Sequence, residues 1–300
     1  MTPATAAAVP NGRPPLAVHV DLDGVHQIFR AHGRSYRGSG DPIFASGMEA
    51  MLQLFDDARI RATLFVIAED LRDSAKRAAL KSAVASGHEI ASHTLTHPNL
   101  LRATRAEKER ELVDSKAALE NTLGVPVRGF RAPGYAIDGE GLQILAGAGY
   151  TYDSSVFPTT AFEQRLGLPR DALRRPLRLT AFGNIVELPL PGPMPLGSPI
   201  GPSFALAFGM PAFAWAMTRA AGRGVPSVLL FHLIDFAAPL DREYRDGAWM
   251  SLFTLSTRSE HSKRAACTKM LDIVGRHFRL TSTQELLAPF SEPRSAAAAS

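Results

Sequence analysis

Short apolar β-type runs alternate with stretches of helical periodicity along most of the chain, and this alternation constrains the fold more than any other feature. We expect strands at residues 16–22, 62–67, 127–131, 150–153, 185–188 and 227–232, with a further strand leading into His93. Helices are expected at residues 47–58, 71–86, 104–123, 138–148 and 258–277. Such alternation predicts an α/β fold with a parallel sheet or barrel.

Polar side chains fall at the ends of these predicted strands. They are Asp21, Asp23, His93, Arg131 and His232. In barrels of alternating strands and helices, the ends that lead from strand to helix form one face, where catalytic groups gather. We therefore expect these five residues to lie together at that face of the barrel.

Two imidazoles separated by one helical turn suggest a metal site. His93 and His97 are four residues apart, so on a turn or helix start both rings project to one side. A third, charged ligand is still needed. Asp21 and Asp23 alternate along a strand and share a face, so one can bind metal while the other handles protons. The structural alternative is that His93 and His97 form a hydrogen-bonded pair within a turn.

Composition describes one globular domain. The chain has 300 residues, 45% of them hydrophobic, and a net charge of +4 from 33 basic and 29 acidic residues, too small an excess to indicate nucleic acid. We expect a catalytic domain at residues 16–285, a disordered arm at 1–15 and a loose tail at 286–300. The arm does not resemble a secretory signal, and the single Cys267 fits a reducing compartment, so we expect a cytoplasmic protein.

Six motifs in order carry a family resemblance. They are Val20-Asp21-Leu22-Asp23-Gly24, Ala62-Thr63-Leu64-Phe65-Val66, the stretch from Gly87 to Pro98 that contains His93-Thr94-Leu95-Thr96-His97, Phe130-Arg131-Ala132-Pro133-Gly134-Tyr135, Tyr152-Asp153-Ser154-Ser155 and Leu230-Phe231-His232. Together they resemble the polysaccharide deacetylase family, carbohydrate esterase family four. The resemblance implies a distorted, TIM-barrel-like (β/α) barrel of about seven parallel strands. It also implies a metal-dependent hydrolase of N-acyl groups on sugars.

The resemblance also assigns roles to individual residues. Asp23, His93 and His97 fall on the metal triad, Asp21 on the catalytic base, Arg131 on the residue that orients the base, and His232 on the general acid. Leu22 separates the two aspartates, as in a branch that includes peptidoglycan and lipid-linked sugar deacylases and some cyclic amide hydrolases. The tryptophan-containing fourth motif is not recognisable, and Asp153 is the candidate partner of Arg131.

These residues can hydrolyse an amide. A carboxylate with two imidazoles suits one divalent ion, zinc first, with cobalt, nickel or manganese as alternatives. Asp21 would act as general base and His232 as general acid. Backbone N–H groups after Pro133, at Gly134 and Tyr135, are candidates for stabilising the oxyanion, and Tyr135 for packing on the substrate.

Residues 188–218 hold no charged residue over 31 positions, with seven prolines and four glycines. The prolines argue against a transmembrane span. We expect a loop and then a buried helix at 211–221, or alternatively an apolar lip beside the site for an acyl chain, lipid carrier or membrane surface. A cluster of basic residues lies just upstream and comprises Arg165, Arg170, Arg174, Arg175 and Arg178. We expect it either to bind a phosphate or anionic headgroup or to be a solvated face.

The predicted function is removal of an N-acetyl or N-formyl group from an amino sugar or glycan. If the apolar lip and the basic cluster both act in binding, we expect a lipid-linked substrate and contact with the membrane surface. One alternative is hydrolysis of a cyclic imide or ureide, and a second is a non-catalytic carbohydrate-binding barrel. His19, His26 and His88 have no motif role and are expected to be structural or surface residues.

Overall fold

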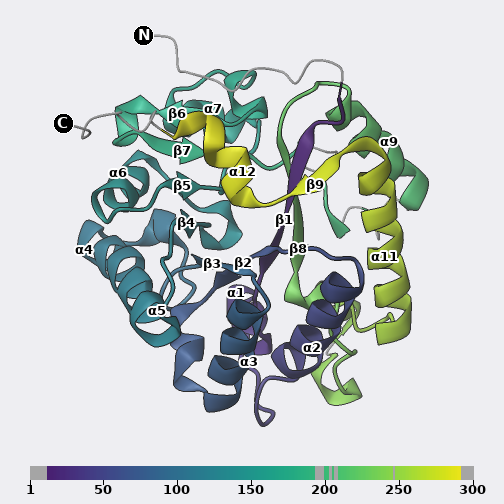
Figure 1. Cartoon of the computed structure of the whole chain (residues 1–300). Helices are drawn as coiled ribbons and strands as arrows, with labels where there is room; N and C mark the ends of the chain where they lie inside the picture. Colours follow the sequence, from purple (N-terminus) through teal and green to yellow (C-terminus); the bar gives the residue numbers. More distant parts are fainter. Residues whose placement is uncertain (1–11, 193–198, 203–204, 206–208, 246, 292–300) are drawn as a thin grey trace, which may run out of the picture.

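The computed structural model describes residues 12–192, 199–202, 205, 209–245 and 247–291. A single curled sheet forms its centre (Figure 1). The strands are β1 (Pro15–Asp21), β2 (Thr63–Val66), β3 (Glu89–Ser92), β4 (Gly129–Phe130), β5 (Tyr152–Asp153), β6 (Leu177–Leu179), β7 (Ile185–Glu187), β8 (Ser227–His232) and β9 (Arg279–Thr281).

The strand order is β6-β7-β5-β4-β3-β2-β1-β8, and β9 pairs with the first part of β1. Every pairing is parallel except that of β6 with β7. Since β6 and β8 lie at opposite ends of this order, the sheet of the described chain is a curled half-barrel. The predicted (β/α) barrel of parallel strands is confirmed in this distorted form.

Helices surround the sheet and lie outside it (Figure 1). They are α1 (Val25–Ala31), α2 (Pro42–Asp57), α3 (Ser74–Ala85), α4 (Arg105–Glu109), α5 (Ser115–Leu123), α6 (Gly139–Gly147), α7 (Thr160–Leu166), α9 (Met210–Ala221), α10 (Gly247–Phe253), α11 (Glu260–His277) and α12 (Thr283–Leu287). None of the described helices is both long enough and apolar enough to cross a membrane.

Local sequence signals explain where the central elements begin and end. All four residues of β2 are buried, as expected for a strand covered on both faces. Thr104 and Glu107 form a reciprocal capping box at the start of α4. Gly124 ends α5 with φ of 70°, a left-handed conformation that glycine adopts without steric cost.

Two predicted boundaries need correction. The expected helix at 104–123 is interrupted by a π-helical turn, Arg110–Asp114, which separates α4 from α5. The expected loose tail at 286–300 begins too early, because Leu286, Leu287 and Phe290 are buried in α12 and the turn after it. Residues 292–300, like most of the predicted arm at 1–15, lie outside the described residues.

Candidate active site

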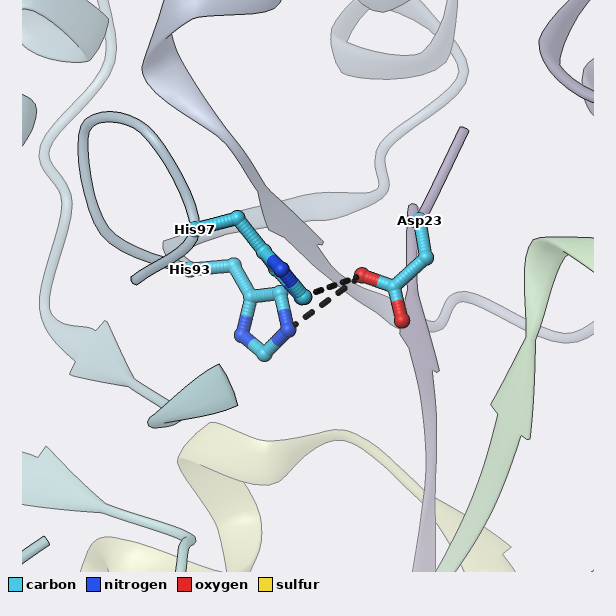
Figure 2. Close-up of side chains that lie close together, drawn as sticks. All are labelled: Asp23, His93 and His97. Carbon is cyan, nitrogen blue, oxygen red and sulfur yellow. Dashed lines mark ion pairs between the residues drawn. The ribbon is translucent and has the colours of Figure 1, made fainter. Parts of the chain in front are cut away.

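Asp23, His93 and His97 converge on one point (Figure 2). The Oδ1 atom of Asp23 lies 3.4 Å from Nε2 of His93 and 3.2 Å from Nε2 of His97. Within the described residues, Oδ1 of Asp23 and Nε2 of His97 are buried without a hydrogen-bond partner. Unpaired buried donors and acceptors are costly, so a carboxylate and two imidazoles facing one another fit a divalent cation.

The backbone fixes the ring of His93. Its Nδ1 lies 2.7 Å from the carbonyl oxygen of Arg131, which can only accept a hydrogen bond. His93 therefore carries its proton on Nδ1, and the lone pair of Nε2 points toward Asp23. A backbone carbonyl that orients a histidine in this way is the usual second partner of a metal-binding imidazole.

A strained loop after β3 presents His97. Thr94 and His97 have φ of 70° and 65°, an uncommon conformation for residues other than glycine. The Oγ1 atom of Thr94 accepts a hydrogen bond of 2.9 Å from the backbone N–H of His97. Glu111 stabilises the middle of the loop and accepts bonds of 2.8 to 3.0 Å from the N–H groups of Leu95 and Thr96 and from the Thr96 hydroxyl.

Glu111 was not predicted as a site residue. It is buried and lies in the π-helical turn between α4 and α5. Single π-helical turns often occur at functional sites. The sequence gives no direct signal for this role, because the contact joins residues that are 15 and 16 positions apart in different elements.

Asp21 and Arg131 form a buried ion pair beside the three candidate ligands. Nη1 of Arg131 donates to Oδ1 of Asp21 at 2.8 Å, and both side chains are almost fully buried. Ser154 occupies further donors of the guanidinium, with its Oγ and its carbonyl oxygen each 2.7 Å away. The guanidinium also lies over the ring of Phe65, 4.1 Å from the centroid. These contacts leave Arg131 little freedom to move.

The remaining partner of Arg131 is His19, which was expected to be a merely structural or surface residue. Nδ1 of His19 lies 2.8 Å from Nη2 of Arg131, and Nε2 lies 2.9 Å from the hydroxyl of Thr283. Burial and the positive charge of Arg131 hold the pKa of His19 well below its ordinary range. The neutral ring therefore accepts from Arg131. A sequence signal exists, since His19, Asp21 and Asp23 alternate at the period of a strand.

His232 lies opposite Asp21 across a strand pairing. β1 and β8 pair so that Asp21 is the register partner of His232. Nε2 of His232 is 3.9 Å from Oδ2 of Asp21. The backbone N–H of His232 donates a 2.7 Å hydrogen bond to Oδ2 of the buried Asp235, which fixes the end of the strand. The predicted base and the predicted acid thus border the same space.

One cavity of about 620 Å³ contains most of the predicted site. Seven of the ten predicted residues line it: Asp21, Asp23, His93, His97, Gly134, Tyr135 and His232. Arg131, Pro133 and Asp153 are buried and are not among its lining residues. Distant parts of the chain therefore meet at one face, as the strand ends predicted.

The expectation for Asp153 is corrected. Its carboxylate accepts hydrogen bonds from the hydroxyl and the backbone N–H of Ser155, and Ser154, not Asp153, hydrogen-bonds Arg131. Asp153 instead lies beside Glu187, its register partner on β7. Burial raises the pKa of both carboxyl groups, so this pair favours holding a proton.

The expectation for the backbone of Tyr135 also needs correction. Its N–H donates to the carbonyl oxygen of Ala132 at 2.9 Å and is therefore not free for an oxyanion. Gly134 has φ of 56° and lines the cavity without a side chain. The ring of Tyr135 lines the cavity as well and packs against Phe157, with centroids 5.2 Å apart.

The predicted apolar lip at residues 188–218 falls partly outside the described residues, and its described part does not line the cavity. The helix expected at 211–221 is α9, which packs against α11. The five arginines upstream do not line the cavity either. Local contacts occupy several of them, including Arg170 with Glu163 at 3.0 Å and Arg174 with Asp171 at 3.2 Å.

Parts of this chain are similar in sequence to known proteins. Residues 40–152 match the family model described as polysaccharide deacetylase. A chitooligosaccharide deacetylase of Sinorhizobium fredii is 33% identical over 94 residues, which cover 31% of this chain and 41% of that protein. A peptidoglycan deacetylase of Helicobacter pylori is 26% identical over 149 residues, which cover 47% and 49%. The chain thus spans less than half the length of these curated relatives.

Solved structures share the fold. A candidate polysaccharide deacetylase from Mycobacterium smegmatis superposes with a TM-score of 0.65 at 19% identity, over 100% of this chain and 99% of that one. An allantoinase superposes with a TM-score of 0.60 at 12% identity, over 93% and 90%. At these identities the likeness concerns architecture alone.

Proposed function

We propose that this protein is a metal-dependent hydrolase that removes the N-acyl group of an amino sugar, and the match of residues 40–152 to the polysaccharide deacetylase family model supports this. One observation carries the proposal: Asp21 and His232 line the same cavity as the cluster of Asp23, His93 and His97. Curated relatives named as deacetylases of chitooligosaccharides and peptidoglycan support the sugar class. The cytoplasmic location stays a prediction.

Asp23, His93 and His97 would hold the divalent ion, for which zinc is our first candidate. When bound, such an ion polarises the acyl carbonyl and lowers the pKa of a coordinated water. The carboxylate of Asp23 is suited to this, because a charged oxygen ligand beside two imidazole nitrogens is a donor set that divalent ions such as zinc accept.

Asp21 is the proposed general base. Oδ1 of Asp21 is bound to Arg131, which leaves Oδ2 facing the cavity to take a proton from the attacking water. Arg131 contributes by position, since its contacts with Ser154 and His19 hold the guanidinium against Asp21. The base is thereby oriented before the substrate binds.

His232 is the proposed general acid. It borders the cavity opposite Asp21 and would deliver a proton to the amine nitrogen as the C–N bond breaks. We assign backbone stabilisation of the oxyanion to the N–H of Gly134, because Tyr135 uses its own N–H in the turn.

The test separates metal binding from proton transfer. Asp23→Ala and His97→Ala are expected to lose both bound metal and release of acetate from N-acetylated chitooligosaccharides. Asp21→Asn is expected to keep the metal and lose turnover by roughly 100-fold or more. His261→Ala, on the exposed side of α11, is the matched control. Full metal retention in Asp23→Ala, measured by mass spectrometry after dialysis, would refute the triad.

Two alternatives have separate outcomes in the same assay. The Asp21-Leu22-Asp23 spacing favours a cyclic imide or ureide hydrolase, which would cleave small cyclic amides and leave N-acetylated sugars intact. A carbohydrate-binding barrel would bind sugars with no turnover of either class. The complete set of base, acid and candidate ligands in one cavity argues against that second alternative.

A further inference from the structure

The cavity above the candidate ligands has a predominantly apolar wall. The floor of the cavity is formed by Asp21, Asp23, His93, His97 and His232. The wall includes Ile28, Ala31, Ile234, Leu252, Phe253 and Leu255, together with the polar His32, Thr257 and Arg258. These residues come from α1, from the turn after β8 and from α10 with the residues after it. Ile234 and Leu255 are buried, whereas Leu252 and Phe253 are exposed, so the wall extends from the protein interior to the surface.

Helix α10 concentrates exposed apolar side chains at this place. Of the six large hydrophobic residues that are exposed in the described chain, Trp249, Leu252 and Phe253 lie on this seven-residue helix, with exposures of 61%, 59% and 37%. The ring of Phe253 packs between Trp249 and His32, at centroid distances of 4.6 and 4.1 Å. Clustered exposed apolar groups beside a cavity indicate a ligand-binding surface.

We propose that this wall, formed by α1 and α10, binds the aliphatic chain of an N-acyl group longer than acetyl. The inference rests on the proposed amide hydrolysis and names the acyl part of its substrate. The acyl carbonyl must lie at the floor, between Asp21 and Asp23, for the reaction to occur. The wall continues directly from that floor, because α1 begins two residues after Asp23 and Ile234 follows His232 by two residues.

The number of bonds between the reacting carbonyl carbon and the first methylene distinguishes the acyl chain from other apolar substituents. The first methylene of an acyl group is bonded to the reacting carbonyl carbon, whereas a chain on the anomeric carbon starts several bonds away. The step itself is ordinary hydrolysis: water oxygen bonds to the acyl carbon, the C–N bond breaks, and a proton goes to the amine. The products are a free amino sugar and an aliphatic carboxylate.

The experiment measures binding separately from turnover. Zinc-loaded Asp21→Asn protein is titrated by calorimetry with N-acetylglucosamine, N-octanoylglucosamine and the octyl glycoside of N-acetylglucosamine. Burial of three methylene groups corresponds to roughly 50-fold in affinity. We expect N-octanoylglucosamine to bind at least about tenfold more tightly than both other ligands, which allows for incomplete burial of the chain.

Variants locate the chain. Leu252→Asn and Ala31→Asp, at exposed positions on the two helices, are expected to reduce the preference for the N-octanoyl ligand at least about threefold. Trp215→Ser removes a similarly exposed hydrophobic side chain from α9, away from the cavity, and is expected to retain the preference. Equal binding of all three ligands, tighter binding of the octyl glycoside, or an equal effect of all three variants would overturn the inference.

The two proposals fail in different ways. If N-octanoylglucosamine binds with the expected preference and wild-type zinc protein hydrolyses none of the amides, the proposed function is wrong and the chain-binding wall stands. If wild-type protein hydrolyses the N-acetyl and N-octanoyl amides with equal kcat/KM and the calorimetry shows no preference, the function stands and the wall is refuted.

Discussion

Nη2 of Arg131 and Nδ1 of His19 lie 2.8 Å apart in the interior, and neither side chain is accessible to solvent. A guanidinium only donates hydrogen bonds, so His19 must accept and stay neutral. The other ring nitrogen of His19 then donates to the hydroxyl of Thr283. His19 is therefore a positioning residue for Arg131, and this relationship makes the fold sensitive to acid.

We predict that stability falls as the pH drops below about 6.5, and that His19→Gln weakens this dependence. Burial and Arg131 hold the pKa of folded His19 well below 6.5. Below that pH the unfolded chain binds a proton that the folded chain excludes, so acid favours unfolding, with a limiting slope of about 1.4 kcal/mol per pH unit. Urea unfolding of metal-free protein between about pH 7.5 and pH 5 measures the slope.

Glutamine can accept from Arg131 and donate to Thr283, which makes the variant a close replacement. His261→Gln, on the exposed side of α11, is the control and should leave the slope unchanged. In activity assays, His19→Gln should lower kcat with little change in KM, because His19 acts through Arg131 and does not line the cavity. If the unfolding free energy of His19→Gln has the same pH dependence as that of the wild type, the folded protein can hold a protonated His19 and the prediction is wrong.

The second prediction concerns the ion pair between Asp21 and Arg131. Arg131→Met leaves a buried carboxylate without its cation and is expected to cost roughly 3–5 kcal/mol of unfolding free energy. Combining it with Asp21→Asn removes that uncompensated charge, so the double variant should be more stable than the sum of the single effects implies. Denaturant titration of all four proteins completes the cycle, and strictly additive costs would contradict the pairing.

The third prediction concerns the loop that carries His97. Glu111→Ala removes the carboxylate that accepts hydrogen bonds from the N–H groups of Leu95 and Thr96. We expect metal affinity to fall roughly 10- to 100-fold, as when partners that orient metal ligands are lost. Competition with a chelating dye measures this. Glu109→Ala removes a carboxylate that forms an exposed pair with Arg105 at 3.0 Å, and this control variant should bind metal as the wild type does.

The fourth prediction tests the packing beneath the site. A Cβ atom on Gly129 would lie 2.0 Å from Cζ of Tyr152, whose ring is fully buried and whose hydroxyl donates to Glu89 at 3.1 Å. Gly129→Ala should therefore destabilise by about 1–3 kcal/mol. Gly147→Ala on α6 meets open space and should instead stabilise by about 0.4–1 kcal/mol. Similar unfolding midpoints for the two variants would be inconsistent with this packing.

Strand ends could be predicted from the sequence because buried parallel strands are nearly continuous apolar runs. β1, β2 and β8 follow this rule, and the polar residues that end β1 and β8 lie where the chain leaves the strand. That rule alone brings Asp21 and His232 to one face, where the structure also pairs them in register.

Contacts made through single residues were harder to predict. Asp153 and Ser154 are neighbours with different partners, so choosing the charged residue as the partner of Arg131 selected the wrong one of two adjacent side chains. A serine hydroxyl and a backbone carbonyl leave no distinctive pattern in a sequence. Glu111 is similar, because its role depends on how a π-helical turn rotates its side chain toward the loop.

Short elements escaped prediction for a physical reason. Helices α1 and α10 have seven residues each, too few to show a clear apolar stripe. Some of their apolar residues line the cavity, namely Ile28, Ala31, Leu252 and Phe253. The cavity wall therefore lies where sequence periodicity is least informative. The apolar stretch at 188–218 is more visible in the sequence, but none of its described residues lines the cavity.

The hydrogen bond between His19 and Thr283 joins residues that are 264 positions apart. During synthesis, a nascent chain that has emerged as far as β8 already holds every proposed metal ligand and both proposed proton-transfer residues. It still lacks the hydroxyl that anchors the imidazole behind Arg131. The contact that holds the imidazole behind Arg131 therefore depends on α12, which follows β8 in the chain.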